Sequence, residues 1–439
     1  MLSILTLLIS FFALASVRFS SDLDIYVYIC ILFFSIAFEL DIFRSKKYRT
    51  YFLPLTAGYF ARVFLLYYAV DLGNPFHLPN LSFSLDSLHF YNAAVRYSKG
   101  YHISFGGIFP KILGTIFSQT GSSRLLAEFI VLLFSIATIM VLITILHELN
   151  ISLFYKQVSV YLICFLPNYM LLSVALLRET MITFFLALSI LFFIRWFNKS
   201  RGEIAFLLAI FFAFMGSMFH GAVGMIAVVY IIIRLVYSPI ERKYQLYYKN
   251  ILYALIFLIV FTVSFRFLGG VIFKKVIDKI DKIDFDEVNT VVEEERGRGG
   301  SNYAKYVGDP SSPVKIVIYA LPRYLYYMYS PFPWQWRGMV DILTFIFSSA
   351  VYLYILVKAL LYIQKTSSSD RYRNLLIALV GIALIMGEIF SWGVSNTGTA
   401  TRHRDKFIAL YMVMLALGSK IEKEPKSQPA ANDASLTKL

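Results

Sequence analysis

The sequence predicts an all-α polytopic membrane protein, a bundle of about twelve transmembrane helices with two large extracytoplasmic loops. Of its 439 residues, 58% are apolar and only 15% are charged, whereas soluble proteins carry about 25% charge. The mean hydropathy is +0.67. The apolar residues also fall into runs close to the length of about 20 residues that a membrane-spanning helix needs. This composition excludes a soluble enzyme and a disordered scaffold.

The predicted spans follow one another along residues 1–418, which we expect to form one integral membrane bundle. They lie near 1–17, 25–40, 51–70, 125–146, 158–176, 180–197, 204–218, 221–237, 251–268, 339–363, 374–391 and 406–418. The first run lacks the basic start and the small-residue cleavage site of a signal peptide, so we expect it to be retained. Segment 419–439 is rich in Lys, Glu, Pro, Ser and Ala, which predicts a disordered cytoplasmic tail.

Lysine and arginine set the predicted orientation, because they gather in cytoplasmic loops. With twelve spans, most basic clusters fall on one side, and both termini lie there as well. The clusters are Arg44 to Arg49, Lys156, Arg195 to Arg201, Arg234 to Lys249, Lys358 to Arg373 and Lys420 to Lys426. The net charge of +14 is therefore explained by topology and by contact with an anionic substrate. A nucleic-acid partner is not expected, because the basic residues do not line one face.

Two long segments, about 71–124 and 269–338, lie on the opposite side and are the predicted extracytoplasmic loops. The second contains an amphipathic stretch, 271–295, and an apolar run, 314–333. A further span at 314–333 would place the following basic loops outside, so we expect that run to lie in the outer interface.

Asp86 is the first candidate functional residue, within the first outer loop. A carboxylate there could take a proton from an acceptor hydroxyl or hold a divalent cation. The alternative is a helix cap at the start of a helix that runs through Tyr91, and the two roles are compatible.

Arg178 and Glu179 interrupt nearly forty apolar residues at the outer end of two spans. Charges at such a depth usually face a cavity or a partner. Arg178 could hold a phosphate oxygen while Glu179 orients it or acts as a base. Alternatively, both residues mark a tight turn and extend to water.

The third candidate cluster is a run of four basic residues in five positions, Arg402, His403, Arg404 and Lys406, at the start of the last span and on the side where basic residues are disfavoured. Arginine pairs at a membrane surface match a diphosphate attached to an apolar tail. A basic turn that binds lipid headgroups without specificity is the alternative.

Weaker candidates complete the set. His220 could line the outer cavity, and Tyr91, Arg298 and Arg323 could contact glycan or phosphate. The alternatives are a structural histidine and a hinge with snorkelling arginines. Arg62 lies in the middle of the third span, where we expect a structural pair with Glu39 or Asp41.

The sequence contains no nucleotide-binding loop, no nucleophile elbow and no metal-ligand spacing. The two cysteines, Cys30 and Cys164, lie inside apolar runs and do not indicate a disulfide or a metal. No cofactor is therefore predicted, with a divalent cation at Asp86 left open, and any chemistry would use a substrate that is already activated.

The predicted architecture, about twelve spans with cytoplasmic ends and arginine-containing outer loops, resembles Wzy-type polymerases of O-antigen or exopolysaccharide. The spacing Asp86-x4-Tyr91-x2-Ala94 also resembles the first outer loop of GT-C glycosyltransferases. Both resemblances imply glycosyl transfer from a polyprenyl (di)phosphate to a hydroxyl, and the GT-C resemblance implies that Asp86 is the acid or base. They further imply a bacterial inner membrane, a polyprenyl-linked glycan as partner and, for the polymerases, a chain-length regulator. A lipid-glycan flippase and a structural subunit of an envelope assembly remain alternatives.

Overall fold

The computed structural model describes residues 1–18, 20–73, 75, 85–149, 151–198, 202–245, 302–303, 306–307, 313–367 and 370–419. This part of the chain is almost entirely helical, which confirms the predicted all-α class. Its helices are α1 (Leu2–Ser16), α2 (Leu23–Arg44), α3 (Lys46–Arg49), α4 (Phe52–Val70), α5 (Leu85–Ser98), α6 (Ile108–Thr120), α7 (Arg124–Glu148), α8 (Leu153–Phe165), α9 (Pro167–Leu172), α10 (Glu179–Phe197), α11 (Gly202–Ser217), η1 (Gly221–Gly224), α12 (Met225–Val236), α16 (Pro313–Tyr329), η3 (Pro333–Gln335), α17 (Met339–Thr344), η4 (Phe345–Ser349), α18 (Ala350–Lys365), α19 (Arg371–Ser391), α20 (Thr397–Arg404), η5 (Asp405–Phe407) and α21 (Ile408–Gly418). Strands β1 (Tyr237–Ser238) and β2 (Lys243–Tyr244) form a short antiparallel hairpin.

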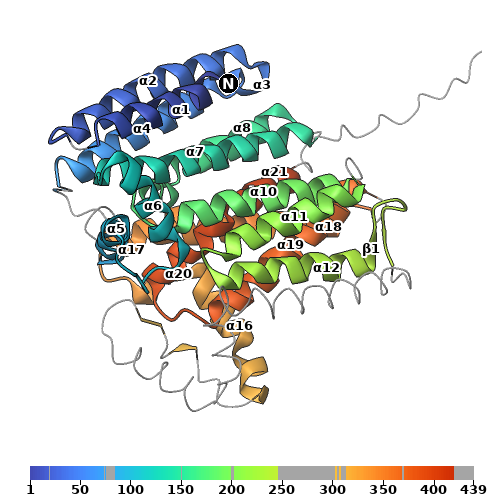
Figure 1. Cartoon of the computed structure of the whole chain (residues 1–439). Coiled ribbons are helices and arrows are strands. Elements are labelled where there is room, and N and C mark those ends of the chain that lie inside the picture. Colours follow the sequence, from blue (N-terminus) through green and yellow to red (C-terminus); the bar gives the residue numbers. More distant parts are fainter. Residues whose placement is uncertain are drawn as a thin grey trace, which may run out of the picture.

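Within the described ranges, six helical segments are long and apolar enough to cross a membrane: α2, α4, α7, α10, the continuous segment Met339–Lys365, and α19. Helices α1, α8 and α11 and the segment Gly221–Val236 are apolar but shorter. Most of these helices run side by side (Figure 1). The chain is therefore a helical membrane protein. The count of twelve spans stays a prediction, and the predicted span 251–268 lies outside the described residues.

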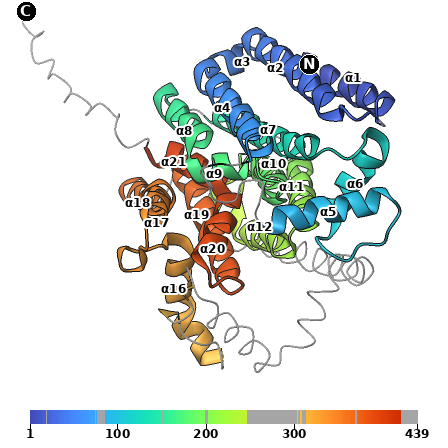
Figure 2. The same cartoon turned by 90° about the vertical axis from the view of Figure 1, so that its left-hand side faces the viewer.

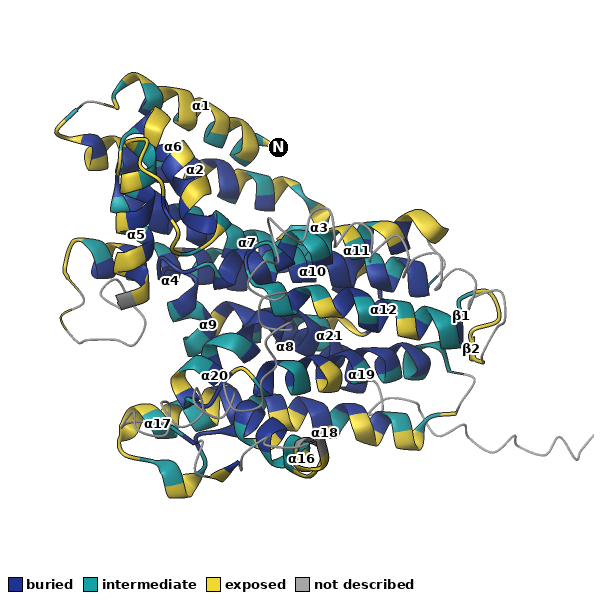
Figure 3. Ribbon diagram, turned by 60° about the horizontal axis from the view of Figure 1, so that its bottom comes forward, coloured by how far each residue is buried: buried dark blue, intermediate teal, exposed yellow. Residues whose placement is uncertain are grey.

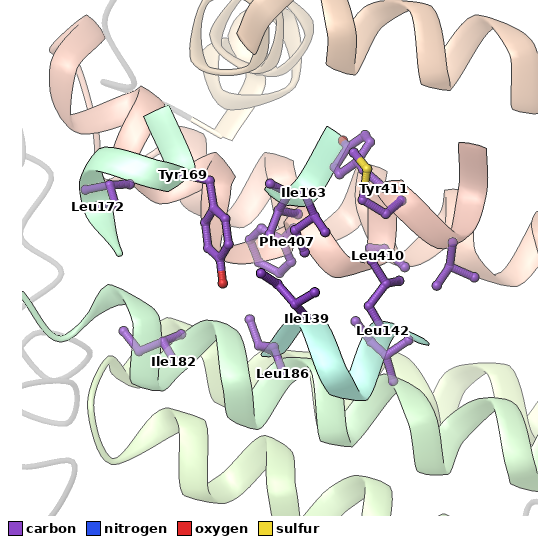
Figure 4. Close-up of a cluster of buried hydrophobic side chains, with 14 of the residues drawn as sticks. Ile139, Leu142, Ile163, Tyr169, Leu172, Ile182, Leu186, Phe407, Leu410 and Tyr411 are labelled. Carbon is purple, nitrogen blue, oxygen red and sulfur yellow. The ribbon is translucent and has the colours of Figure 1, made fainter. Parts of the chain in front are cut away.

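The core of the bundle surrounds α21, in which every residue is buried. A helix that is apolar on all sides must be enclosed by others, and α21 packs against α7, α8, α10, α18 and α19. Figure 4 shows side chains of α7, α10 and α21 meeting there, among them Ile139, Leu142, Ile182, Leu186 and Leu410. In contrast, α1 buries only Leu14 and is largely exposed (Figure 3), as expected of a helix that faces lipid.

One end of the bundle, called here the basic end, carries α3 and the β1–β2 hairpin. Polar contacts join its elements: Arg195 Nε with Glu148 (3.0 Å), Arg371 Nε with Asn198 (2.9 Å), Asn374 Nδ2 with the Arg242 carbonyl (3.0 Å) and Lys47 Nζ with Thr144 (2.6 Å). The amino terminus lies here too, because the Met1 ammonium is 2.7 Å from Asp41. Several residues of the predicted cytoplasmic clusters take part in these contacts. They thus lie together at the basic end of the bundle.

The opposite end, called here the site end, carries α5, α6 and α20 and faces the viewer in Figure 2. Helices α5 and α6 are the described part of the first predicted outer loop, and they pack closely: a Cβ on Gly114 would lie 2.7 Å from the Ala94 carbonyl. Of the second predicted loop, the amphipathic stretch 271–295 lies outside the described residues. Its apolar run forms α16, which packs on α18, α19 and α20.

The buried Arg62 of α4 compensates for a break between α8 and α9. Pro167 has no N–H, so the carbonyl of Ile163, four residues earlier, cannot receive a helical hydrogen bond. Arg62 Nη2 donates to this carbonyl at 3.3 Å, and Nη1 donates to the Cys164 carbonyl at 2.8 Å. Arg62 therefore holds α4 against the end of α8.

The expected carboxylate pair of Arg62 is wrong, although its structural role is confirmed. Glu39 accepts instead from the Thr56 hydroxyl at 2.6 Å, and Asp41 binds the Met1 ammonium. A helix end supplies enough partial negative charge to receive a guanidinium.

Candidate functional site

Arg402, in the last turn of α20, binds two carboxylates from distant parts of the chain. Its Nη1 donates to Asp86 Oδ2 at 2.9 Å, and its Nη2 donates to Glu179 Oε1 at 3.1 Å. Arg402 and Glu179 are mostly buried, with 17% and 5% of their side chains exposed, whereas half of the Asp86 side chain is exposed. Three predicted site residues thus meet, and they are accessible from the Asp86 side.

Each of these charges lies at the end of a helix that favours it. Asp86 is in the first turn of α5 and Glu179 is the first residue of α10, where the helix dipole is positive. Arg402 is in the last turn of α20, where the dipole is negative. Asn396 caps the start of α20 by accepting from the Gly398 N–H at 2.8 Å. Local helix chemistry therefore supports the placement of all three side chains.

Two further cations lie beside Glu179. The Arg178 guanidinium lies over the Phe90 ring, 6.0 Å from its centroid, and the buried Lys406 ammonium lies 5.4 Å from the Phe390 centroid. Both act electrostatically on Glu179. Two guanidiniums and the Lys406 amine thus face two carboxylates, and their N–H donors favour an anionic ligand.

His220, in the turn between α11 and η1, and His403 of α20 form an aromatic group with Phe390. The two imidazole centroids are 5.1 Å apart, and both rings contact Phe390. Burial, together with the charges of Lys406 and Arg178, lowers the pKa of His220 to about 3 and the pKa of His403 well below its usual range. Both imidazoles are therefore neutral near pH 7.

We call Asp86, Arg178, Glu179, His220, Arg402, His403 and Lys406 the charged cluster. Five of its buried atoms have no hydrogen-bond partner in the part of the chain that the structure describes: Glu179 Oε2, Arg402 Nε, Lys406 Nζ, His220 Nδ1 and His403 Nδ1. Buried polar atoms nearly always have a partner, and an isolated buried charge is costly. These atoms are therefore available to a polar ligand.

Three other predicted binding residues lie outside the charged cluster. Arg404 is two positions after Arg402, about 200° around the helix, and its Nη1 donates to the Met328 carbonyl of α16 at 2.6 Å. Arg323 is buried against the Trp392 ring, 4.6 Å from its centroid. Tyr91 packs against α6. The structure thus gives these side chains contacts within the bundle instead of a place beside Arg402.

Arg298 lies outside the described residues. Within the described ranges, no group of three or more His, Cys, Asp or Glu side chains could hold a metal ion. The carboxylates of Asp86 and Glu179 share Arg402 instead.

The sequence pattern places Lys406 in the basic cluster without a separate role, and it assigns no role to Phe90 or Phe390. Lys406 ends the basic run that begins at Arg402, so its charge was visible in the sequence. The two phenylalanines resemble ordinary core residues, and only the packing of α5 and α19 places them under Arg178 and Lys406.

Comparisons with protein-family models, with curated proteins and with solved structures find no match to this chain.

Proposed function

We propose that this protein transfers a glycosyl unit from a polyprenyl phosphate or diphosphate to a hydroxyl of an acceptor glycan, polymerising a cell-envelope polysaccharide such as O-antigen or exopolysaccharide. The carrying observation is the charged cluster at one end of an apolar bundle, where two guanidiniums and an amine face two carboxylates and several buried atoms have no partner among the described residues. A phosphate attached to a long apolar chain, such as undecaprenyl diphosphate, complements the charged cluster with its phosphate and the apolar bundle with its chain.

In this proposal the cations receive the leaving phosphate. Arg178, Lys406 and the free Nε of Arg402 offer donors that the described part of the chain does not otherwise occupy. Negative charge grows on the phosphate oxygen as the glycosyl C–O bond breaks, and fixed cations in a partly dry site stabilise that charge. The polyprenyl (di)phosphate then leaves as an anion.

The carboxylates handle the proton of the acceptor. Asp86 is the more exposed of the two, so we assign it the proton that the attacking hydroxyl loses as the new C–O bond forms. Glu179, buried beside Arg178 and Arg402, orients both guanidiniums. Its unpartnered Oε2 is the alternative base.

The charge distribution supports placing the site end outside the cytoplasm. Arg44, Lys46, Lys47 and Arg242 lie at the basic end, which the positive-inside rule assigns to the cytoplasm. Twelve spans in a bacterial inner membrane, cytoplasmic termini and a chain-length regulator as partner belong to the same proposal.

The distribution of polar groups favours transfer over transport. A flippase needs polar side chains through the depth of the bundle, but the deeply buried Arg62 is bound to backbone carbonyls and the charged cluster lies at one end. A GT-C-like enzyme that makes a single transfer would use the same cluster, and the length of the product separates the two.

The test is a transfer assay in vesicles that contain the purified protein and a fluorescent polyprenyl-diphosphate oligosaccharide. We expect longer, lipid-linked products from the wild type, and losses of at least a hundredfold for Arg178→Ala and Glu179→Gln. Arg337→Ala is the matched control, because this half-exposed arginine precedes α17 and pairs with Asp341, four residues later. A wild-type protein that moves the glycan across the vesicle without joining it would overturn the proposal.

A further inference from the structure

A hollow of about 390 Å³ lies at the site end, between α5 and the loop that follows it. Its polar lining is His89, Asn92, Arg96, His102 and Ser104, with Phe105 as its aromatic wall. The volume falls within the range of about 300–1,000 Å³ that is typical of small-molecule sites. None of the lining residues belongs to the charged cluster.

Tight packing holds the loop on α5. Gly106 has a positive φ of 80°, and a Cβ on this residue would lie 2.8 Å from the Phe90 ring, so only glycine allows this approach. The approach holds the Phe105 ring 5.5 Å from the His89 centroid and 5.3 Å from the Phe90 centroid. The wall of the hollow is therefore part of the folded structure.

The lining of the hollow combines basic and polar side chains with an aromatic ring. The residues that line the hollow provide a guanidinium, two imidazoles, an amide and a hydroxyl, but no carboxylate. Arg96 makes no ion pair with any residue that the structure describes, so its planar donors are open to a carboxylate. Phe105 offers a ring on which the C–H face of a sugar can pack.

The hollow also lies along the helix that carries Asp86, because four of its lining residues belong to α5. Asp86 precedes His89 by about one turn of α5, and Arg96 lies about 15 Å farther along the helix than Asp86. A glycan that occupies the hollow would extend along α5 toward Asp86, the residue to which the proposed function assigns the acceptor proton.

We propose that this hollow binds an acidic sugar of the acceptor glycan, a hexuronic acid whose carboxylate pairs with Arg96. This inference rests on the proposed function for its identification of the occupant as acceptor. It adds a substrate class and a specificity residue that the charged cluster does not supply.

The test is saturation-transfer NMR of the full-length protein in detergent with methyl glucuronide, methyl glucoside and inorganic phosphate as separate probes. We expect methyl glucuronide to bind at least tenfold more tightly than methyl glucoside, and phosphate not to displace it. Arg96→Gln should remove this preference and Arg96→Lys should reduce it. Lys99→Gln is the matched control, because Lys99 is exposed on the same segment but does not line the hollow.

Equal binding of the two glycosides, full displacement by phosphate, or an unchanged preference in Arg96→Gln would overturn the inference. These outcomes are independent of transfer, so the proposed function would survive them if Arg178→Ala and Glu179→Gln still abolished product. Conversely, an Arg96-dependent preference for the glucuronide with no transfer activity would leave a glycan-binding hollow and overturn the proposed function alone.

Discussion

The guanidinium of Arg402 lies 3.1 Å from Glu179, although 223 residues separate the two along the chain. Glu179 is almost completely buried; Arg402 is hydrogen-bonded to it, and Arg178 and Lys406 act on it electrostatically. The same guanidinium binds Asp86, which is 316 residues away. One side chain therefore joins the starts of α5 and α10 to the end of α20. The hydrogen bonds of Arg402 thus both set the geometry of the site and hold these three helices together.

Replacing Arg402 tests this shared role. Arg402→Met leaves Glu179 buried without its partner, which costs about 3–5 kcal/mol of unfolding free energy. In Arg402→Met/Glu179→Gln the buried carboxylate that lost its hydrogen-bonded partner is gone, so we expect most of the stability to return, whereas transfer should stay absent. Unfolding in detergent and the vesicle assay measure the two effects. A double variant as unstable as Arg402→Met would show that this ion pair does not determine stability.

Gly114 should affect the site through the backbone. A Cβ at this position would lie 2.7 Å from the Ala94 carbonyl, which cannot rotate away. Gly114→Ala should therefore separate α5 from α6, at a cost of about 1–3 kcal/mol, and weaken transfer by moving Asp86 away from Arg402.

Gly381→Ala in α19 is the control for Gly114→Ala, because no atom lies within 4 Å of a Cβ there. It should stabilise the helix by up to about 1 kcal/mol and leave transfer unchanged. Full activity in Gly114→Ala, with the same melting temperature as the wild type, would contradict the proposed coupling of α5 packing to the site.

The sequence predicts the fold class and several cluster residues because their signals are local. A run of apolar residues indicates a span wherever it packs, and a charged pair such as Arg178 and Glu179 stands out within such a run. The excess of basic residues after Thr401 likewise conflicts with the predicted orientation without reference to any neighbour.

Contacts between distant segments could not be predicted in this way. The direction in which Arg404 points depends on the rotation of the short helix α20 about its axis, and its neighbour Met328 belongs to α16. The missing N–H of Pro167 is visible in the sequence, but only the packing of α4 against α8 identifies Arg62 as its substitute. The rotation of a helix about its own axis and the identity of its neighbours are set by tertiary packing, which the sequence pattern does not reveal.

The neutral histidines predict a pH dependence of stability. The pKa of His220 falls from 6.5 to about 3 on folding, so between about pH 6.5 and 3 the unfolded chain binds a proton that the folded chain does not. The free energy of unfolding is therefore highest above about pH 6.5, and it decreases as the pH falls through this window.

Melting curves of the wild type and of His220→Asn/His403→Asn, recorded at several pH values between about 7.5 and 4.5, check this expectation. Stability should fall toward acid in both proteins, but less steeply in the double variant, which cannot bind the two protons on unfolding. Equal slopes would mean that neither buried histidine controls the acid sensitivity.

The orientation of the bundle can be tested with single cysteines, because Gln119 is exposed on α6 at the site end and Lys243 is exposed on β2 at the basic end. In a Cys30→Ser/Cys164→Ser background, a membrane-impermeant maleimide added to intact cells should label Gln119→Cys. Lys243→Cys should react only after the membrane is permeabilised, because the basic end faces the cytoplasm in the predicted orientation. The reverse pattern would place the charged cluster in the cytosol. A donor exposed on the outer leaflet could not then reach Arg178 and Lys406, and the proposed transfer would have to use a carrier on the inner leaflet.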